Sequence, residues 1–200
     1  SSYLPSTNQP SPGDFLLVYK EAREKELEVV SIHLSSGISG TVQSASLAAQ
    51  MMKDKNVHVV DSLKASVGEG LMVLEAARMA QSGADVHSIL KRLQEMQARL
   101  HCVFVVGNLD ALLKGGRLTR TKAIIAGTLG IKPVLHINET GRIVPFDRAR
   151  GHKGAQLKLM EIMDRLGADI AHQTVGICHS DCRGDALYLR ESIQTRFAAP

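Results

Sequence analysis

The sequence contains no tryptophan, and aromatic residues make up only 4% of its 200 positions. Proteins that hold single-stranded nucleic acid commonly stack bases on aromatic side chains, so this composition supplies such a platform poorly. The net charge of +4 comes from 24 basic and 20 acidic residues, which are interspersed along the chain. We therefore expect no nucleic-acid partner.

Cysteine and long apolar runs are also scarce. The three cysteines, Cys102, Cys178 and Cys182, do not make the dense disulfide framework of small secreted proteins. Cys178 and Cys182 flank His179, but this spacing matches no common zinc motif, so we expect no metal and no cofactor besides a bound ligand. No run approaches the roughly 20 apolar residues of a membrane-spanning helix, and no signal peptide is visible. The sequence predicts a soluble, cytoplasmic protein without an integral membrane segment.

Hydrophobic residues make up 44% of the chain, which is enough for a substantial core. Strand-like apolar runs alternate with stretches of helical period, which predicts an α/β fold with mostly parallel sheets. The turn residues Asn138 to Gly141 predict one β-hairpin in the second half. A change of character near residue 100 predicts two lobes, 1–100 and 101–200. The predicted strands are 29–34, 57–61, 102–107, 131–137, 142–146 and 175–179, and the predicted helices include 40–53, 70–81 and 85–100.

The most informative stretch is LSSGISGT, residues 34–41, between a predicted strand and a predicted helix. Ligands of parallel α/β sheets bind beyond the carboxyl ends of strands, where a helix N-terminus offers N–H groups and partial positive charge. Together with the hydroxyls of Ser35, Ser36, Ser39 and Thr41, these groups suit a carboxylate or a phosphate. Alternatively, Ser39 simply caps the helix. The stretch is neither a nucleophile elbow nor a P-loop.

Three further stretches each have a functional and a structural interpretation. Residues 6–15 (STNQPSPGDF) offer polar groups at Thr7 and Asn8, or serve only as a turn that caps a helix beginning near Gly13. Residues 112–123 (LLKGGRLTRTKA) present Lys114 and Arg117 to an anion, or form a basic surface loop. The glycine-containing apolar stretch that follows, up to Ile137, lines a hydrophobic tunnel or is ordinary core.

In this order the stretches resemble the DegV family, the bacterial fatty-acid-binding proteins also called FakB. The resemblance extends over nearly the whole chain. The matching motifs are TNQPSP (7–12), SIHLSSGISGT (31–41), DS (61–62) with Ser66, Gly68 and Gly70, LLKGGRL (112–118) and GIKP (130–133).

The resemblance implies a two-lobed carrier that holds a long-chain fatty acid and is not itself an enzyme. The first lobe would carry the carboxylate-binding loop and the second the acyl-chain tunnel. A separate, ATP-dependent fatty acid kinase subunit would phosphorylate the carboxylate to an acyl phosphate for phospholipid synthesis. Thr7 and Ser39 match residues that hydrogen-bond the carboxylate, and Asn8, Ser36 and Gly40 lie beside them. Arg117 matches a residue implicated in the productive interaction with the kinase. No residue is assigned a catalytic role.

Two family segments have no counterpart in this sequence, namely an N-terminal strand and helix and a C-terminal strand with a G-x-H-x-G-P-G-like motif. We expect a fragment or a divergent member. Two other function classes remain open. One is a stand-alone phosphotransferase or hydrolase that uses the Ser35 to Ser39 loop, which predicts turnover by the chain alone. The other is a regulatory or interaction protein with a vestigial pocket, which predicts no co-purified lipid.

Overall fold

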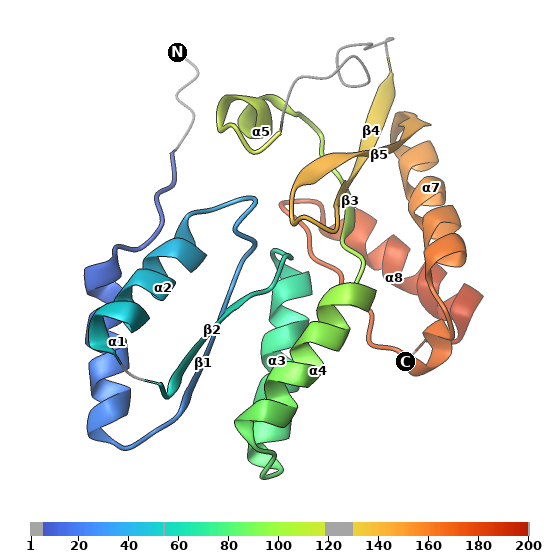
Figure 1. Cartoon of the computed structure of the whole chain (residues 1–200). Helices are drawn as coiled ribbons and strands as arrows, with labels where there is room; N and C mark the ends of the chain where they lie inside the picture. Colours follow the sequence, from blue (N-terminus) through green and yellow to red (C-terminus); the bar gives the residue numbers. More distant parts are fainter. Residues whose placement is uncertain (1–5, 54, 119–129, 200) are drawn as a thin grey trace. The chain divides into compact units, whose positions relative to one another are not determined.

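The computed structural model describes residues 6–53, 55–118 and 130–199, in which helices and strands are interspersed along the chain (Figure 1). The α/β class predicted from the sequence is confirmed. The chain divides into two compact units, Ser1–Leu100 with Ile137–Ile143, and His101–His136 with Val144–Pro200. The elements are α1 (Pro12–Glu24), β1 (Val29–His33), α2 (Thr41–Met52), β2 (Val57–Asp61), α3 (Val67–Gln81), α4 (Val86–Arg99), β3 (Val103–Val105), α5 (Asp110–Lys114), β4 (Ile131–Ile137), β5 (Ile143–Arg150), α7 (Gly151–Leu166), η1 (Ile170–His172) and α8 (Arg183–Phe197).

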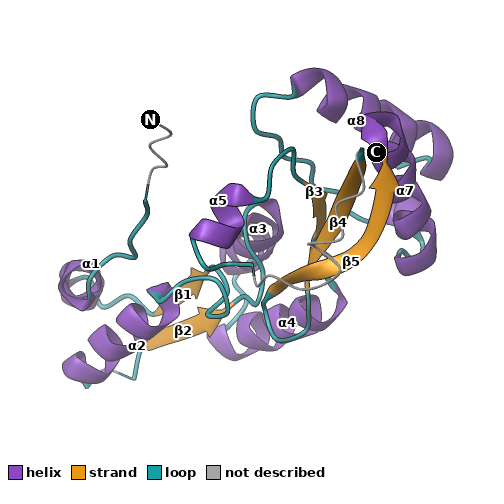
Figure 2. Ribbon diagram, turned by 90° about the horizontal axis from the view of Figure 1, so that it is seen from above, coloured by secondary structure: helices purple, strands orange, loops and turns teal. Residues whose placement is uncertain are grey.

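The first unit is a parallel pair of strands between two pairs of helices. β1 and β2 pair in register from Val29↔Val57 to His33↔Asp61. Helices α1 and α2 lie on one side of the pair, and α3 and α4 lie on the other (Figure 2). The core cluster of α3 and α4 packs against alternate strand residues, as the period of two in a strand requires. The buried members of this cluster are Met72, Ala76, Ile89 and Leu93, and Val30, Ile32 and Val60 pack on them.

The second unit contains a three-stranded sheet in the order β3-β4-β5, with β3 antiparallel to β4. Among the described strands, the parallel pair is thus β1 with β2 in the first unit. Val134 and Ala149 from this sheet form a core with residues of α7, and Met160 of α7 packs with Ile193 of α8 in a second cluster.

The predicted hairpin joins β4 to β5, and its turn residues belong to the first unit. The Asn138 side chain accepts hydrogen bonds from the N–H groups of Thr140 and Arg142, at 3.2 and 2.9 Å between Oδ1 and N. Gly141 has a φ of 72°, a conformation that favours glycine. The turn is therefore built from local contacts, as its sequence indicated.

The strand predicted at residues 175–179 was wrong. These residues form no strand, and neither sheet of the described residues includes them. Val175, Ile177 and their neighbours have the apolar composition of a buried strand, but a strand also needs a partner for its backbone N–H and C=O groups. Composition alone could not reveal whether such a partner exists.

The other predicted strands and helices fall close to their predicted positions, whereas α5 and η1 were not predicted. Helix α3 begins three residues before the predicted start at Gly70, and β5 continues past Phe146 to Arg150. No helix in the described ranges combines the length and the apolar character needed to cross a membrane.

Candidate functional site

The loop between β1 and α2, residues 34–40, lies at the carboxyl end of the parallel strand pair. It is tied to the loop after β2, because the Ser35 N–H donates to Lys64 O at 2.7 Å and the Ser62 N–H donates to His33 O at 3.0 Å. The two loops that follow the paired strands therefore form one local structure. This is the position where parallel α/β sheets bind ligands.

Ser35 anchors this loop. Its side chain is fully buried, and its Oγ donates to Gly141 O in the hairpin turn at 2.7 Å. The same Oγ accepts the Gly37 N–H at 3.1 Å. Ser35 O also accepts the N–H groups of Ile38 and Ser39, at 3.0 and 3.1 Å. Ser35 thus fixes the loop by contacts with the hairpin turn, with the loop after β2 and with the residues that follow it in its own loop.

Ser36 is exposed, and its backbone N–H faces a carboxylate of the protein itself. The donor lies 3.2 Å from Asp61 Oδ1, which also accepts the Leu63 N–H at 2.9 Å. Of the two donors that Ser36 could offer a ligand, the backbone N–H is therefore already bonded, and the hydroxyl is the group left for a ligand.

Ser39 and Gly40 form the entry to helix α2. Ser39 Oγ lies 2.8 Å from Thr41 Oγ1 and accepts the Thr41 N–H at 3.3 Å. The N-cap position itself is Gly40, which makes no side-chain capping bond, and the first turn contains no acidic residue. Ser39 therefore satisfies one donor of the helix end and leaves the dipole of α2 without a negative side chain in that turn.

Thr7 and Asn8 lie exposed in the loop before α1. The structural interpretation of this stretch is confirmed in that Ser11 caps α1, which begins at Pro12. The stretch also reaches the α2 entry, since a Cβ added to Gly40 would lie 2.8 Å from Gln9 Nε2. Gln9 therefore lies against Gly40 and brings the loop that carries Thr7 and Asn8 to the helix entry.

Sequence reasoning missed a series of hydrogen-bonded polar side chains on the strand that leads into the same loop. Tyr19 Oη lies 2.8 Å from Ser31 Oγ, which lies 2.8 Å from His33 Nε2. The Phe15 ring packs edge-on against the His33 ring with centroids 5.1 Å apart. Burial lowers the pKa of His33, and the negative charge of Asp61 opposes this shift. A signal was available, because the alternation in VVSIH places Ser31 and His33 on the face opposite Val30 and Ile32.

Two further ionisable residues lie next to the loop and were also missed. Lys64 is only 4% exposed and supplies the carbonyl that accepts the Ser35 N–H. Burial raises the pKa of Glu69, and a hydrogen bond from the Leu34 backbone opposes the shift. Neither position stands out in the sequence, because lysine and glutamate are usually exposed.

The hydroxyls of Ser35 and Ser39 lack the geometry of an activated nucleophile. A catalytic serine needs a base within hydrogen-bond reach to take its proton. Ser35 Oγ donates instead to a backbone carbonyl, Ser39 Oγ pairs with Thr41, and the His33 Nε2 contact is with Ser31. These contacts suit ligand binding better than covalent chemistry.

Arg117 lies in the second unit, directly after α5. It is exposed, and its guanidinium donates to Gly115 O at 2.5 Å. Of the stretch predicted to line a tunnel, residues 124–129 lie outside the described residues, so the tunnel stays a prediction.

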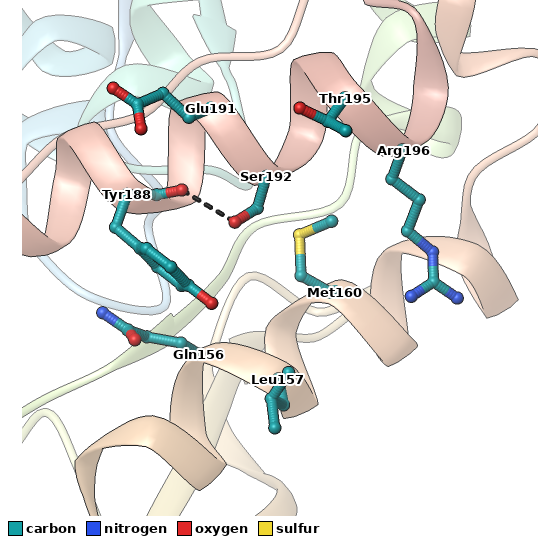
Figure 3. A pocket seen from close by; sticks show the side chains of 8 residues that line it. All are labelled: Gln156, Leu157, Met160, Tyr188, Glu191, Ser192, Thr195 and Arg196. Carbon is teal, nitrogen blue, oxygen red and sulfur yellow. Dashed lines mark hydrogen bonds between the residues drawn. The ribbon is translucent and has the colours of Figure 1, made fainter.

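The second unit has an open groove between α7 and α8 (Figure 3). Gln156, Leu157 and Met160 of α7 face Tyr188, Ser192 and Thr195 of α8 across it. Ser192 Oγ donates to Tyr188 O at 2.8 Å, so this hydroxyl is already engaged by its own helix. None of the site residues predicted from the sequence lines this groove.

The segment from Cys178 to Cys182 precedes α8 in the sequence. Within it, the Cys182 N–H donates to His179 Nδ1 at 3.4 Å. No cluster of three or more potential metal ligands occurs among the described residues.

Fold and site together define a two-unit α/β protein with a hydroxyl-rich loop between a parallel strand and a helix. Comparison with known proteins agrees, since the sequence matches the DegV family, described as uncharacterised proteins, over residues 1–199. The chain belongs to the DegV family. The resemblance seen in the sequence motifs is thus confirmed.

Individual relatives support the assignment. A DegV domain-containing protein of Caldanaerobacter subterraneus subsp. tengcongensis is 39% identical over 178 residues, which cover 89% of this chain and 63% of that protein. A Thermus thermophilus DegV-family structure, described by its fatty acid binding, has 41% identity and a TM-score of 0.76, over 82% of this chain and 58% of that chain. The chain therefore spans less than two thirds of either protein.

A third relative is linked to a kinase system by its own description. The Streptococcus pneumoniae Fatty Acid Kinase (Fak) B3 protein loaded with linoleic acid has 25% identity and a TM-score of 0.83. The match covers 96% of this chain and 67% of that chain.

Proposed function

We propose that this chain belongs to a carrier that binds a long-chain fatty acid and holds its carboxylate at the entry to α2. The observation that carries the proposal is the loop at the carboxyl end of β1, where the Ser39 and Thr41 hydroxyls meet a helix end whose N-cap residue, Gly40, has no capping side chain. The fatty acid binding described for the Thermus thermophilus relative supports the same ligand class.

The physical chemistry of the loop favours a carboxylate. A carboxylate that leaves water costs several kcal/mol unless hydrogen bonds replace its hydration. Ser39 and the backbone at Gly40 would provide such bonds, with the Ser36 hydroxyl beside them. Thr7 and Asn8 would add donors from the loop that Gln9 holds against Gly40. Each buried methylene of the acyl chain would contribute about 0.8 kcal/mol, so affinity would come mainly from the chain and orientation from the loop.

We also propose that a separate, ATP-dependent kinase subunit receives the bound carboxylate and phosphorylates it in the cytoplasm. The Streptococcus pneumoniae relative supports this partner class, because it is described as part of a fatty acid kinase system. Arg117, exposed after α5, would contact this partner or the phosphate. In this scheme the first lobe carries the carboxylate loop, the second carries the acyl-chain tunnel, and the chain itself performs no catalysis.

The test is native mass spectrometry of the purified chain, followed by solvent extraction and identification of the bound lipid. We expect a fatty acid in the wild-type protein and about tenfold weaker retention in Ser39→Ala and in Thr7→Ala, which is the effect of losing about 1.4 kcal/mol of hydrogen bonding. Ser180→Ala, an exposed serine of the second unit, is the matched control. A protein that carries no lipid and ignores added palmitate and oleate would refute the proposal for this chain.

A further inference from the structure

The hairpin turn at residues 138–142 makes close contact with the candidate head-group loop, although the two segments lie far apart in the sequence. Ser35 and Gly141 are 106 residues apart, yet Ser35 Oγ donates to Gly141 O at 2.7 Å. Both residues are buried. A buried carbonyl requires a partner, so this hydrogen bond is part of the structure of both segments.

The glycines on each side explain how the backbones approach so closely. A Cβ added to Gly37 would lie 2.6 Å from Gly141 O, and a Cβ added to Gly141 would collide with Ser35 Oγ. Gly37 has no positive φ that would require glycine for the turn itself. Its lack of a side chain is therefore explained by the approach of Gly141.

The same contact controls the backbone of the loop. Ser35 Oγ donates to Gly141 O and accepts the Gly37 N–H, so the hairpin turn orients a hydroxyl that in turn orients the next peptide groups. Ser35 O then receives the Ser39 N–H at 3.1 Å. The position of Ser39, and with it the entry to α2, thus depends on how Ser35 is held.

We propose that the Ser35–Gly141 contact, here termed the latch, positions the loop for head-group binding. Ser35 is then a positioning residue: it sets the direction of the donors around Ser39 without touching the ligand. This inference rests on the proposed function, because it assigns a role within the same site. It predicts that loss of the latch weakens binding of a carboxylate selectively and leaves binding of the acyl chain unchanged.

The turn can be separated from the latch experimentally. Its own hydrogen bonds run from Thr140 and Arg142 to the side chain of Asn138, so they do not involve Ser35. Ser35→Ala therefore removes the latch and leaves the internal bonds of the turn intact. Ser35→Cys keeps a weak donor in the same place and should restore part of the effect.

The experiment compares palmitate with hexadecanol, which has the same chain length but no carboxylate, in binding titrations of the 200-residue chain. We expect Ser35→Ala to weaken palmitate binding about tenfold, the equivalent of about one hydrogen bond, and hexadecanol binding less than twofold. Ser35→Cys should fall between Ser35→Ala and the wild type. Leu93→Ala, in the core between α3 and α4, is the control for general destabilisation and should leave the ratio of the two affinities unchanged.

The outcomes separate the two proposals. A wild-type chain that binds neither ligand contradicts the proposed function and the latch with it. A wild-type chain that binds palmitate, combined with equal losses for acid and alcohol in Ser35→Ala, overturns the latch alone. Amide hydrogen exchange provides a readout that needs no ligand. The Ser39 N–H donates to the backbone carbonyl of Ser35, which Ser35→Ala retains, so this amide should exchange at least tenfold faster only if the latch holds the loop, and unchanged protection would also overturn the latch.

Discussion

The N-termini of helices α1 and α2 belong to the same unit but are completed in different ways. At α1, Ser11 Oγ accepts the Asp14 N–H at 3.3 Å, and the Asp14 carboxylate accepts the Ser11 N–H at 2.8 Å. At α2, the cap is Gly40, which makes no side-chain bond, and the first turn contains no acidic residue. The end of α1 is therefore capped by a local serine and a local carboxylate. The end of α2 has one local bond, from the Thr41 N–H to Ser39 Oγ, and is otherwise supported by segments distant in the sequence.

This difference bears on which end can accept an anion. The two hydrogen bonds from Ser11 lower the pKa of Asp14, so a full negative charge already lies at the N-terminus of α1. The loop before α2 is instead supported by Gly141 below Gly37 and by Gln9 against Gly40. An end without a negative side chain in its first turn leaves its dipole available to a ligand, together with the one hydroxyl proton that the Ser39–Thr41 pair does not use. The comparison therefore supports the α2 entry as the head-group site.

The largest effect is expected from Gly37→Ala, which would break the external support of α2. The new Cβ would lie 2.6 Å from Gly141 O and 2.9 Å from Gly141 C, and neither is a flexible side-chain atom. Forcing the backbones apart should lower the free energy of unfolding by about 2–3 kcal/mol. Urea unfolding followed by circular dichroism measures this change.

The matched control for Gly37→Ala is Gly70→Ala in helix α3. A Cβ at Gly70 meets nothing within 4 Å, so the alanine should fit and should raise the free energy of unfolding by about 0.5–1 kcal/mol. If both variants move stability in the same direction by similar amounts, the close approach of the turn to Gly37 has no energetic weight. The contrast drawn between the two helix ends would then fail.

A smaller effect is expected from Ser11→Ala, which opens the local cap of α1. Loss of the capping box should cost about 1 kcal/mol of stability. Fatty acid retention should stay at the wild-type level, because this cap is distinct from the head-group loop, whereas Ser39→Ala should weaken retention. Thermal unfolding and lipid extraction on the same preparations measure both quantities. Loss of lipid in Ser11→Ala would mean that the two helix ends are not functionally separate.

The same contrast explains which features could be predicted from the sequence. The cap of α1 lies within four residues, Ser11 to Asp14, with proline at the first helical position, and was visible as a turn that begins a helix. The strands and helices follow short-range periodicity, so most of them fall near their predicted bounds. Local sequence also indicated the hairpin turn, since Asn138 bonds its own neighbours.

Features that depend on distant segments could not be read in this way. Nothing near Ser35 indicates that its hydroxyl meets a carbonyl 106 residues away, and nothing near Gly40 points to Gln9. The segment 175–179 has the composition of a strand, but pairing depends on a neighbour that composition does not specify. The motif resemblance singled out the loop that we propose as the head-group site, and the structure adds the contacts that hold this loop.

The smallest expected effect is a dependence of stability on pH through His33, which lies beside the supported loop. Burial lowers the pKa of His33 below its usual value of 6.5, against the opposing charge of Asp61. The unfolded chain then binds a proton more readily than the folded chain, so the contribution is fully present above about pH 6.5 and is lost as pH falls through the folded pKa. Glu69 acts with the opposite sign, because its pKa is raised and its contribution is lost as pH rises.

Comparing variants isolates the histidine from these other groups. We expect the free energy of unfolding of the wild-type chain to decline from pH 7 toward pH 5, and His33→Gln to flatten this decline. His87→Gln, an exposed histidine on α4, should keep the wild-type slope. If the free energy of unfolding declines equally in His33→Gln and in the wild type, the hydrogen-bonded series of Tyr19, Ser31 and His33 does not hold a neutral imidazole. In that case these three side chains would form a solvated surface, and the support of the α2 entry would come from Gly141 and Gln9 alone.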